Sequence, residues 1–414
     1  MSDIKIPEKA MDLQSRGKFR GFLITASSLS GLSFLLMFNK SLLSWISDWF
    51  RWCPTSTALL EDAERRMLSY VESDCDLSFV PINSSADGEC KVRSMIVNKN
   101  LEDKATPLVL LHGFGSGIGL WVLNIDSLSK DRPLYALDIL GFGLSSRPTF
   151  SNDAEVAENQ IIDSIEEWRK KVGLKQFILL GHSMGGFLAA SYAIKFPERV
   201  KHLFLADPWG FPIREGNEKP RIHIPLWART LVLLLKPFNP LAYLRAVGPW
   251  GPQLIQRMRP DILRKFETVV TDTSDVSNYI YHCNAQHPSG EAAFKAMTIQ
   301  FGWANRPMIQ RIAQLRQDIP ISFIFGAQSW IDSSSGDKTT ALRENSYVKI
   351  EMIDGAGHHV YADRAEVFNN LVCQICRKVD NNELSVTSPT SSKGSNMLSL
   401  NATKIEDTCL PEPV

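Results

Sequence analysis

Residues 177–196 read FILLGHSMGGFLAASYAIKF, an apolar run that passes through a GxSxG motif into an apolar helical pattern. A GxSxG between a strand and a helix makes the chain turn sharply and leaves the serine at the tip of a strained turn. Gly181 and Gly185 keep the backbone from clashing in that turn. The following helix places the positive end of its dipole where an oxyanion would form. This context predicts Ser183 as a nucleophile.

Short β-rich runs occur on both sides of this motif, and helical patterns separate several of them. We predict strands at 91–97, 107–111, 134–138, 176–181, 200–206, 319–326 and 348–353. We predict helices at 154–172, 183–196 and 364–378. Strands that alternate with helices imply a mostly parallel sheet with helices on both faces, which is an α/β fold.

A second loop with chemistry follows the strand LVLL and reads Leu111-His112-Gly113-Phe114-Gly115. An HG-type turn supplies a backbone N–H that, with the N–H after the nucleophile, holds the negative charge that develops in acyl transfer. We predict Phe114 and Met184 as these two donors, with Gly115 as the alternative to Phe114. The sequence contains neither GxGxxG nor a P-loop lysine, so we predict no nucleotide cofactor.

A third loop, Gly355-Ala356-Gly357-His358-His359, lies between the last strand and the last helix. A histidine here completes the chain order Ser…Asp…His and would accept the proton of the nucleophile. We predict His358 as this general base because it directly follows the glycine turn, and His359 is the alternative. The other histidines near strands, namely His112, His182 and His202, are expected to satisfy local hydrogen bonds.

The acid that orients the histidine has two candidates. Asp332, in Ser329-Trp330-Ile331-Asp332, follows the strand ISFIFG, where such folds usually place the acid. Asp207, after the strand LFLA, competes with it because a carboxylate there also reaches the histidine. We predict Asp332 as the acid. Asp138 is expected to brace a turn.

The strand pattern lapses between residues 212 and 317, where amphipathic helical stretches such as 226–236 appear. We interpret 212–317 as an inserted helical cap between two parts of the core, 61–211 and 318–379. The cap contains fourteen Lys and Arg against seven Asp and Glu, whereas the whole chain of 414 residues is neutral. A basic cap is usually a solvated face but also suits anionic headgroups or a substrate phosphate. Nothing in the bulk charge indicates nucleic acid.

Residues 1–60 are expected to attach the protein to a membrane or lipid surface. Residues 21–38 are uncharged over 18 positions, which is just long enough to span a bilayer, although five Ser and Thr weaken that interpretation. The sequence leaves open whether this stretch spans or lies flat. Trp45, Trp49 and Trp52 then share one apolar helix face, and tryptophan favours the interface between water and lipid. A helix packed under the catalytic domain is the alternative.

The remaining sequence features concern compartment and metals. No cleavable signal peptide precedes the seven cysteines, which favours a reducing compartment facing the cytosol. Cys373 and Cys376 form a CxxC inside a helical pattern with no second pair, so no metal site is predicted. Residues 380–414 are rich in Ser, Thr and Asn with few aromatics and are expected to be disordered.

Several long motifs resemble one subfamily of the α/β-hydrolase fold, the one that contains α/β-hydrolase domain proteins four and five. The resemblance runs from about residue 45 to 380. The motifs that carry it are HGFGSGIGLW (112–121), DILGFGLSSRP (138–148), GHSMGGFLAASYAIKFPERVKHL (181–203), DPWGFP (207–212), YIYHCNAQHPSGEAAFKAM (279–297), SWID (329–332) and GAGHHVYAD (355–363).

The resemblance implies two functional alternatives. One branch keeps the serine and resembles a phospholipase B-type enzyme that removes acyl chains from N-acyl phosphatidylethanolamine or its lyso form. The other branch usually carries Asn there and resembles a lipid-droplet co-activator of a triglyceride lipase, to which acylation of lysophosphatidic acid has been attributed. Ser183 and the HHVYAD sequence favour the first branch. His358 and Asp363 form the HxxxxD motif on which the acyltransferase interpretation depends.

The same resemblance implies a location and partners. An acyl-glycerophospholipid is the expected substrate, no cofactor or metal is expected, and a lipase or a droplet-coat protein is the expected protein partner. The expected location is the cytosolic face of the endoplasmic reticulum membrane, the lipid droplet, or both, with mitochondrial association as an alternative. The long N-terminal extension departs from both branches.

Overall fold

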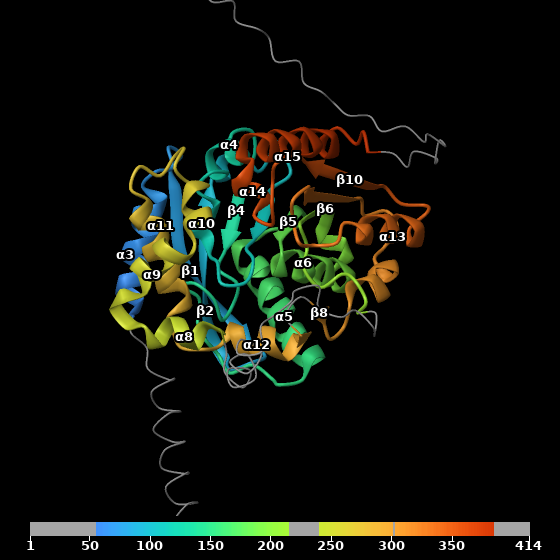
Figure 1. Cartoon of the computed structure of the whole chain (residues 1–414). Helices are drawn as coiled ribbons and strands as arrows, with labels where there is room; N and C mark the ends of the chain where they lie inside the picture. Colours follow the sequence, from blue (N-terminus) through green and yellow to red (C-terminus); the bar gives the residue numbers. More distant parts are fainter. Residues whose placement is uncertain (1–54, 215–239, 301–302, 385–414) are drawn as a thin grey trace, which may run out of the picture.

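A computed structural model describes residues 55–214, 240–300 and 303–384 of the chain. Its centre is an eight-stranded sheet in the order β1-β2-β4-β3-β5-β6-β9-β10 (Figure 1). The pairs β1–β2 and β2–β4 are antiparallel, and the remaining neighbours in this sheet are parallel. The carboxyl ends of the parallel strands therefore meet along one edge of the sheet, where loops that carry chemistry can converge.

The strands of this sheet are short, as in most α/β folds. They are β1 (Cys75–Ser84), β2 (Gly88–Val97), β3 (Leu108–Leu111), β4 (Leu134–Leu137), β5 (Phe177–His182), β6 (Val200–Ala206), β9 (Ile321–Gly326) and β10 (Val348–Ile353). A separate two-stranded ribbon pairs β7 (Thr298–Gln300) with β8 (Trp303–Ala304).

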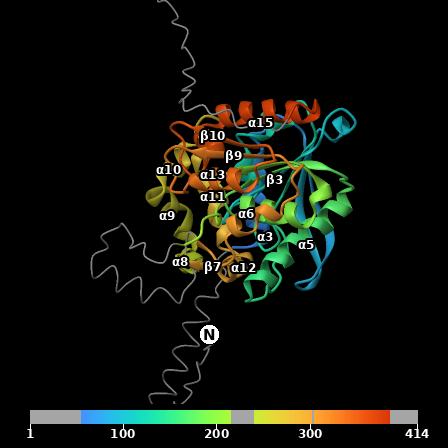
Figure 2. The ribbon, with the colours of Figure 1, turned by 90° about the vertical axis from the view of Figure 1, so that its right-hand side faces the viewer.

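Helices cover both faces of the sheet, and each face has its own apolar cluster. Alternate residues of the central strands enter opposite clusters, as Leu179 and Leu180 of β5 do. The helices α5 (Ala154–Val172) and α6 (Met184–Lys195) pack on one face (Figure 2). The opposite face is covered by α3 (Thr57–Leu68), α4 (Ile125–Ser129) and α15 (Ala365–Asp380). Because both faces are buried, the central strands are apolar throughout rather than alternating.

The residues between β6 and β9 that the structure describes are mostly helical. They form α8 (Pro240–Ala246), α9 (Gly251–Met258), α10 (Pro260–Arg264), α11 (Thr273–Asn284) and α12 (Gly290–Met297). In Figure 1, α8, α9, α10 and α11 gather beside α3 at one side of the sheet. Two further helices, α13 (Ser334–Leu342) and α14 (Val360–Asp363), follow β9 and β10.

The predicted α/β architecture is confirmed, and most predicted elements coincide with observed ones. The strands predicted at 200–206 and 348–353 and the helix predicted at 154–172 have the same bounds in the structure. The sequence pattern did not predict β1 or α3. The boundary expected between residues 60 and 61 falls inside α3, whose Leu60 is buried against the core. The apolar segment 21–38, the tryptophan face, the helix expected at 226–236 and most of the tail lie outside the described residues.

Candidate active site

Ser183 occupies a strained turn between β5 and α6. Its backbone has φ 53° and ψ −118°, a left-handed conformation that non-glycine residues rarely adopt. A Cβ on Gly181 would lie 2.2 Å from the Gly185 carbonyl oxygen, and one on Gly185 would lie 2.4 Å from the Leu111 carbonyl oxygen. Only glycine fits at these two positions, so the motif holds the serine between a central strand and the start of a helix.

His358 lies against the serine, as the sequence predicts. The His358 Nε2 atom is 2.9 Å from the Ser183 Oγ atom. Its other ring nitrogen, Nδ1, is 2.6 Å from Oδ2 of Asp207. Because a carboxylate only accepts hydrogen bonds, Nδ1 carries the proton and Nε2 is free to accept the serine proton. The three side chains form one continuous chain of hydrogen bonds with the polarity that a general base needs.

The acid in this chain is Asp207, and the prediction of Asp332 is wrong. The Asp207 side chain is 0% exposed and also accepts hydrogen bonds from the Gly326 N–H and the Ser329 hydroxyl. The Asp332 carboxylate is exposed and accepts instead from the backbone N–H and hydroxyl of Ser334, at 3.0 and 2.6 Å. Those bonds hold the pKa of Asp332 below its usual value. Asp332 therefore braces the turn into α13.

The positions of the strands explain this outcome. The order of neighbours is β5, β6, β9, so the loop after β6 lies between the serine loop and the loop after β9. Asp207 follows β6 with φ 45°, a turned backbone that ends the strand. Ser329, which the sequence analysis did not single out, belongs to the loop that was expected to supply the acid and instead donates to the Asp207 carboxylate.

The loop after β3 lies directly beside the nucleophile. A Cβ on Gly113 would be 3.2 Å from the Ser183 Cβ. His112 holds this loop, since its Nε2 accepts from the Ile139 N–H and its Nδ1 donates to the Gly113 carbonyl. Burial lowers the pKa of His112 and so keeps the ring neutral. A neutral ring can accept at Nε2 and donate at Nδ1 at the same time.

The predicted oxyanion donors have free N–H groups. In the part of the chain that the structure describes, neither the Phe114 nor the Met184 N–H donates to another protein group. Gly115, the alternative donor, has φ 68° and its carbonyl accepts from the Asn284 side chain of α11. The turn beside the serine is thus fixed by the core on one side and by the cap on the other.

Asp138 braces this loop, as predicted. It is fully buried after β4, and it accepts hydrogen bonds from the Ile118 and Leu144 N–H groups at 2.8 and 2.7 Å. Burial raises the pKa of its carboxyl. The Asp138 side chain makes no hydrogen bond to Ser183 or His358 among these described residues, so its part in the site is structural.

The remaining histidines near the site are neutral and structural. The His182 Nε2 donates to the His358 carbonyl oxygen over 2.8 Å, which ties the two catalytic loops together. Burial, followed by the neighbouring His358 and His359, lowers the pKa of His182 well below its usual value. His359 points to the cap, where its Nδ1 lies 3.4 Å from the Lys265 Nζ, and burial lowers its pKa to about 3. The choice of His358 over His359 agrees with this geometry.

Asp363 pairs locally and does not contact the His358 ring. Its Oδ2 accepts from the Gly357 N–H at 2.9 Å, and its Oδ1 lies 2.8 Å from the Lys265 ammonium of the cap. Both oxygens are therefore engaged away from Ser183. Asp363 therefore links the loop that carries His358 to the cap.

Two adjoining cavities lie at the site, and one of them is lined by Ser183. The first, about 530 Å³, is bounded by Ser183, His358 and cap residues that the sequence analysis did not single out, among them Arg259 and Lys265. The second, about 260 Å³, is mostly apolar and shares Phe114 and Tyr361 with the first. Its apolar lining comes largely from the cap: Leu241, Leu244, Ile255, Ile262, Phe266 and Ile280. The sequence predicted helices in the cap, but it did not show which apolar side chains of those helices face the cavity.

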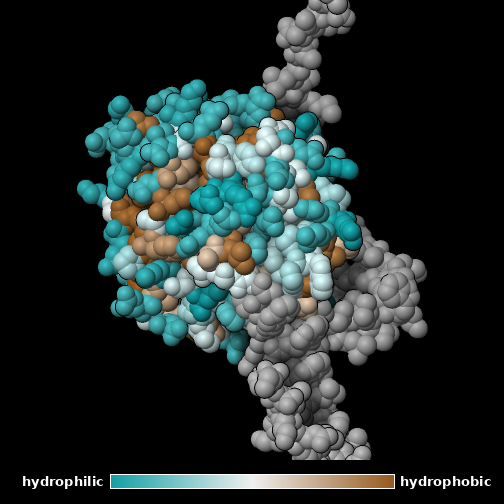
Figure 3. All heavy atoms as spheres, turned by 90° about the vertical axis from the view of Figure 1, so that its left-hand side faces the viewer, coloured by the Kyte–Doolittle hydropathy of each residue, from teal (hydrophilic) through white to brown (hydrophobic). Residues whose placement is uncertain are grey.

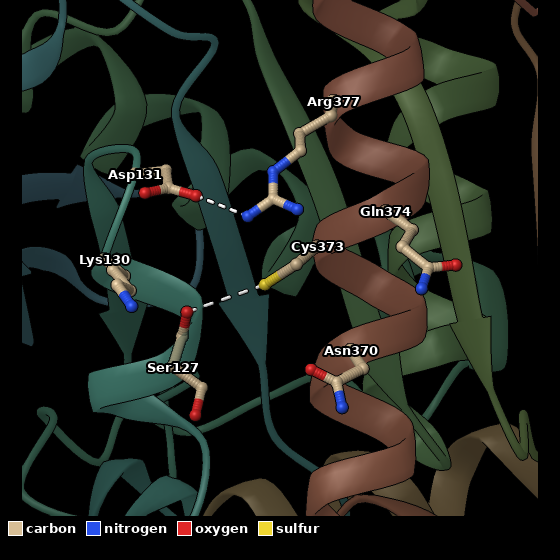
Figure 4. Close-up of a pocket in the computed structure, with 7 residues that line it drawn as sticks. All are labelled: Ser127, Lys130, Asp131, Asn370, Cys373, Gln374 and Arg377. Atoms are coloured by element: carbon tan, nitrogen blue, oxygen red, sulfur yellow. Dashed lines mark hydrogen bonds and ion pairs between the residues drawn. The ribbon is translucent and has the colours of Figure 1, made fainter.

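The CxxC motif lies on α15, and neither of its cysteines lines the two cavities of the site. The Cys373 thiol donates to the Ser127 carbonyl of α4, and Arg377 pairs with Asp131 beside it (Figure 4). Burial raises the pKa of both thiols, that of Cys376 to about 12. Within the described residues no group of three or more His, Cys, Asp or Glu side chains is arranged to hold a metal ion.

Comparison with known proteins places the chain in a family. Residues 106–365 match the model of the alpha/beta hydrolase fold family, so the chain belongs to that family. Within it, the chain belongs to the subfamily of α/β-hydrolase domain proteins four and five, because members of that subfamily are 51% and 54% identical to it over 79% of its length.

The curated relatives are similar over most of their length. The chain is 54% identical to 1-acylglycerol-3-phosphate O-acyltransferase ABHD5 from Mus musculus, covering 79% of this chain and 91% of that protein. It is 51% identical to (lyso)-N-acylphosphatidylethanolamine lipase from Bos taurus, covering 79% and 94%. The match to the human lipase of that name is 50% identical, with the same coverage.

Solved structures are similar in fold alone. A bacterial membrane phospholipase A superposes with a TM-score of 0.53 at 19% identity, covering 87% of this chain and 99% of that one. Naproxen esterase from Bacillus subtilis superposes with a TM-score of 0.53 at 17% identity, covering 76% and 96%. Among the helices that the structure describes, none is long and apolar enough to cross a bilayer.

Proposed function

We propose that this protein is a serine hydrolase that cleaves acyl esters of glycerophospholipids. The observation that carries the proposal is the hydrogen-bonded chain from the Ser183 hydroxyl through His358 to the buried Asp207, at 2.9 and 2.6 Å. A serine used only for structure would not require a strained turn, an imidazole nitrogen aimed at its hydroxyl and a buried carboxylate behind that imidazole together.

The proposed reaction passes through a covalent ester. The Ser183 oxygen attacks the carbonyl carbon of an acyl ester while His358 Nε2 accepts the serine proton. The Phe114 and Met184 N–H groups donate to the oxygen that becomes negative in the tetrahedral intermediate. The intermediate collapses, His358 returns the proton to the departing glycerol oxygen, and the acyl group remains on Ser183. His358 then takes a proton from water as the water oxygen attacks the ester carbon, and it returns that proton to the Ser183 oxygen as the fatty acid leaves.

The two cavities suit a lipid substrate. The mostly apolar cavity beneath the cap is a compartment for an acyl chain, because apolar side chains from α8, α9, α10 and α11 surround it. The cavity at Ser183 also has charged lining residues, Arg259, Asp261 and Lys265, which suit the polar headgroup side of a phospholipid. The relatives named (lyso)-N-acylphosphatidylethanolamine lipase support N-acyl phosphatidylethanolamine or its lyso form as the substrate.

Acyl transfer is the second candidate, because the relatives named ABHD5 are described as 1-acylglycerol-3-phosphate O-acyltransferases at up to 54% identity. In a serine mechanism, a lysophosphatidic acid hydroxyl would take the place of water. In an HxxxxD mechanism, His358 would act on that hydroxyl directly and Asp363 would be its partner. The position of Asp363, bonded to Gly357 and Lys265, argues against the second route. A co-activator of a triglyceride lipase is a non-catalytic rival that Ser183 disfavours.

We extend the proposal to location and partners. The protein acts at the cytosolic face of the endoplasmic reticulum membrane, on lipid droplets, or on both, with mitochondrial association as the alternative. Residues 1–60 attach it there, and a lipase or droplet-coat protein is its protein partner. Replacing Trp45, Trp49 and Trp52 by Ala tests the attachment, since it removes rings that favour the lipid interface. The expected result is a shift from the membrane or droplet fraction to the soluble fraction. Unchanged fractionation would overturn the role of the tryptophans, and would mean either that residues 21–38 span the bilayer or that the tryptophans pack under the catalytic domain.

The catalytic proposal is tested by a lipid panel with purified wild-type protein and Ser183→Ala. Wild type should release fatty acid from N-acyl phosphatidylethanolamine or its lyso form and should react with a fluorophosphonate probe. Ser183→Ala should do neither while unfolding at the same temperature as wild type. Release of fatty acid by Ser183→Ala at the wild-type rate would contradict the proposal.

A further inference from the structure

The cap helix α9 exposes an apolar ridge. Trp250, the N-cap residue of α9, and Leu254 and Met258 within the helix follow one another at four-residue spacing, which places them on one side of the helix. They are 72%, 37% and 68% exposed. The opposite face of α9 is buried through Pro252 and Ile255. This helix is thus apolar on two sides, and only one side is used for packing in the described fold.

Single exposed apolar residues are ordinary on protein surfaces, but a row on one helix indicates an interaction site. Figure 3 views the molecule from the side of α3, α9 and α11 and shows apolar side chains at the surface among hydrophilic ones. Trp250 is the most exposed large apolar side chain in the described chain. A tryptophan ring with one polar N–H favours a boundary between water and lipid over a dry protein interface.

Cationic side chains accompany the ridge. Arg257, Arg259 and Arg264 are exposed on α9, α10 and the turn between them, and the one acid among them is Asp261. The Arg259 guanidinium donates to both carboxylate oxygens of Asp261, at 3.0 and 2.9 Å. Arg257 and Arg264 make no ion pair with any described residue, so their charge is available to an anionic partner. An apolar face bordered by arginines is complementary to an anionic phospholipid surface.

The ridge lies beside the cavities of the site. Ile255 and Arg259 of this segment line the apolar cavity, and Arg259 and Asp261 also line the cavity at Ser183. The Arg259 and Asp261 side chains are about half exposed, which places the opening of that cavity next to the end of α9. A lipid surface seated on the ridge would therefore meet the cavity opening.

We propose that the outer face of α9, formed by Trp250, Leu254 and Met258 with Arg257 and Arg264 beside it, docks the catalytic domain onto an anionic phospholipid surface. The docking surface contains none of residues 1–60. It turns the opening of the catalytic cavity toward the lipid, so that an acyl chain enters from the surface without crossing water. The docking itself does not depend on hydrolysis, whereas the delivery of substrate rests on the proposed function.

Hydrogen exchange on the full chain tests the contact directly. The protein is incubated with vesicles of phosphatidylcholine, with or without phosphatidylserine, and exchange is followed peptide by peptide. The expected result is slower exchange in residues 248–259 with phosphatidylserine vesicles, reduced by high salt because the arginine contribution is screened. Unchanged exchange in 248–259 with vesicles bound would overturn the proposal.

Matched variants test the energetic contribution. Leu254→Asp adds a charge to the ridge, and Leu342→Asp adds the same charge to α13, at a leucine that is 47% exposed. Both changes are made in the chain that carries Trp45→Ala, Trp49→Ala and Trp52→Ala, so that attachment through residues 1–60 does not mask the difference. In vesicle flotation, Leu254→Asp should lower partitioning roughly tenfold relative to Leu342→Asp. Both variants are first checked for wild-type thermal unfolding. Equal partitioning of the two variants would contradict the proposal.

A second copy of the chain is the other occupant that an apolar ridge could accept. Sedimentation without lipid distinguishes it, because a dimer lost in Leu254→Asp but kept in Leu342→Asp would make the ridge a protein interface and overturn lipid docking. Loss of vesicle partitioning in Leu254→Asp with fluorophosphonate labelling of Ser183 retained would support docking. Failure of Ser183 to label in wild type would count against the proposed function and not against docking.

Discussion

Replacing Asp207 by Asn tests the architecture of the triad. In the native protein the Asp207 carboxylate accepts from the His358 Nδ1–H at 2.6 Å and is completely buried. Asparagine has nearly the same shape, but one of its two terminal atoms is an NH₂ donor. The Ser329 hydroxyl and the Gly326 N–H both donate toward this carboxylate. The Gly326 N–H lies on Oδ1, whereas the Ser329 hydroxyl and the His358 Nδ1–H share Oδ2. An amide that keeps its oxygen on the Gly326 N–H therefore places its NH₂ group toward His358, and the Ser329 hydroxyl can rotate to accept from that group.

The consequence is a change of imidazole tautomer. If the side-chain amide introduced by Asp207→Asn donates to His358 Nδ1, the ring carries its proton on Nε2 and cannot accept the Ser183 proton. The same exchange of Asp for Asn in the serine proteases lowers kcat about 10⁴-fold, and we expect a loss of that order here. Binding of substrate should change little, so the loss should fall on kcat rather than on KM.

The assay is hydrolysis of an acyl ester by Asp207→Asn, with Asp332→Asn as the matched control. Asp332 is exposed and bonded to Ser334, so its replacement should leave kcat within about threefold of wild type. Thermal unfolding of each variant separates a catalytic loss from a folding defect. The assignment of the acid would be refuted if Asp332→Asn lost activity by orders of magnitude while Asp207→Asn retained it.

Two other expectations follow from the cavities and the buried charges. Leu244→Trp should fill the apolar cavity and reduce hydrolysis of a long-chain ester about tenfold more than hydrolysis of a short-chain ester. The measurement is a chain-length series, with Leu244→Met as the control. Equal effects on both chain lengths would contradict the acyl compartment. Burial lowers the pKa of His202 to about 3, so His202 stays neutral in the fold while the unfolded chain is protonated below its usual pKa near 6.5. Its contribution to the free energy of unfolding is therefore present above about pH 6.5 and is lost as pH falls, at up to about 1.4 kcal/mol per pH unit. Urea unfolding from about pH 7 to about pH 5 should show a smaller loss of stability in His202→Gln than in wild type. The same dependence of stability on pH in both proteins would contradict a buried, neutral His202.

The parts of the fold that were predictable are those in which local pattern and burial agree. β6 and β10 are apolar or alternating runs bounded by turns, and α5 is an amphipathic helix with a capping Asp153 and a terminal Gly173. β1 was missed because it is an edge strand with few buried residues and with Pro81 in its middle.

The site residues that could be predicted are those whose position depends only on the sequence immediately around them. Ser183 is defined by the glycines around it, and His358 by its place after the last strand. The acid depends on which of two neighbouring loops approaches the imidazole, and both Asp207 and Asp332 follow strands that end at the same edge. Ser334, two residues from Asp332, captures that carboxylate locally, and such a contact is settled only in three dimensions.

In the proposed mechanism the acyl group is held as an ester on Ser183. This step is tested by measuring fatty-acid release and acyl transfer in parallel in Ser183→Ala and Asp363→Asn. We expect Ser183→Ala to lose fluorophosphonate labelling, lipid hydrolysis and any transfer to lysophosphatidic acid. We expect Asp363→Asn, which weakens only the bonds to Gly357 and Lys265, to cost far less. Transfer that survives Ser183→Ala but vanishes in Asp363→Asn would contradict the serine mechanism and make the protein a transferase of the HxxxxD type.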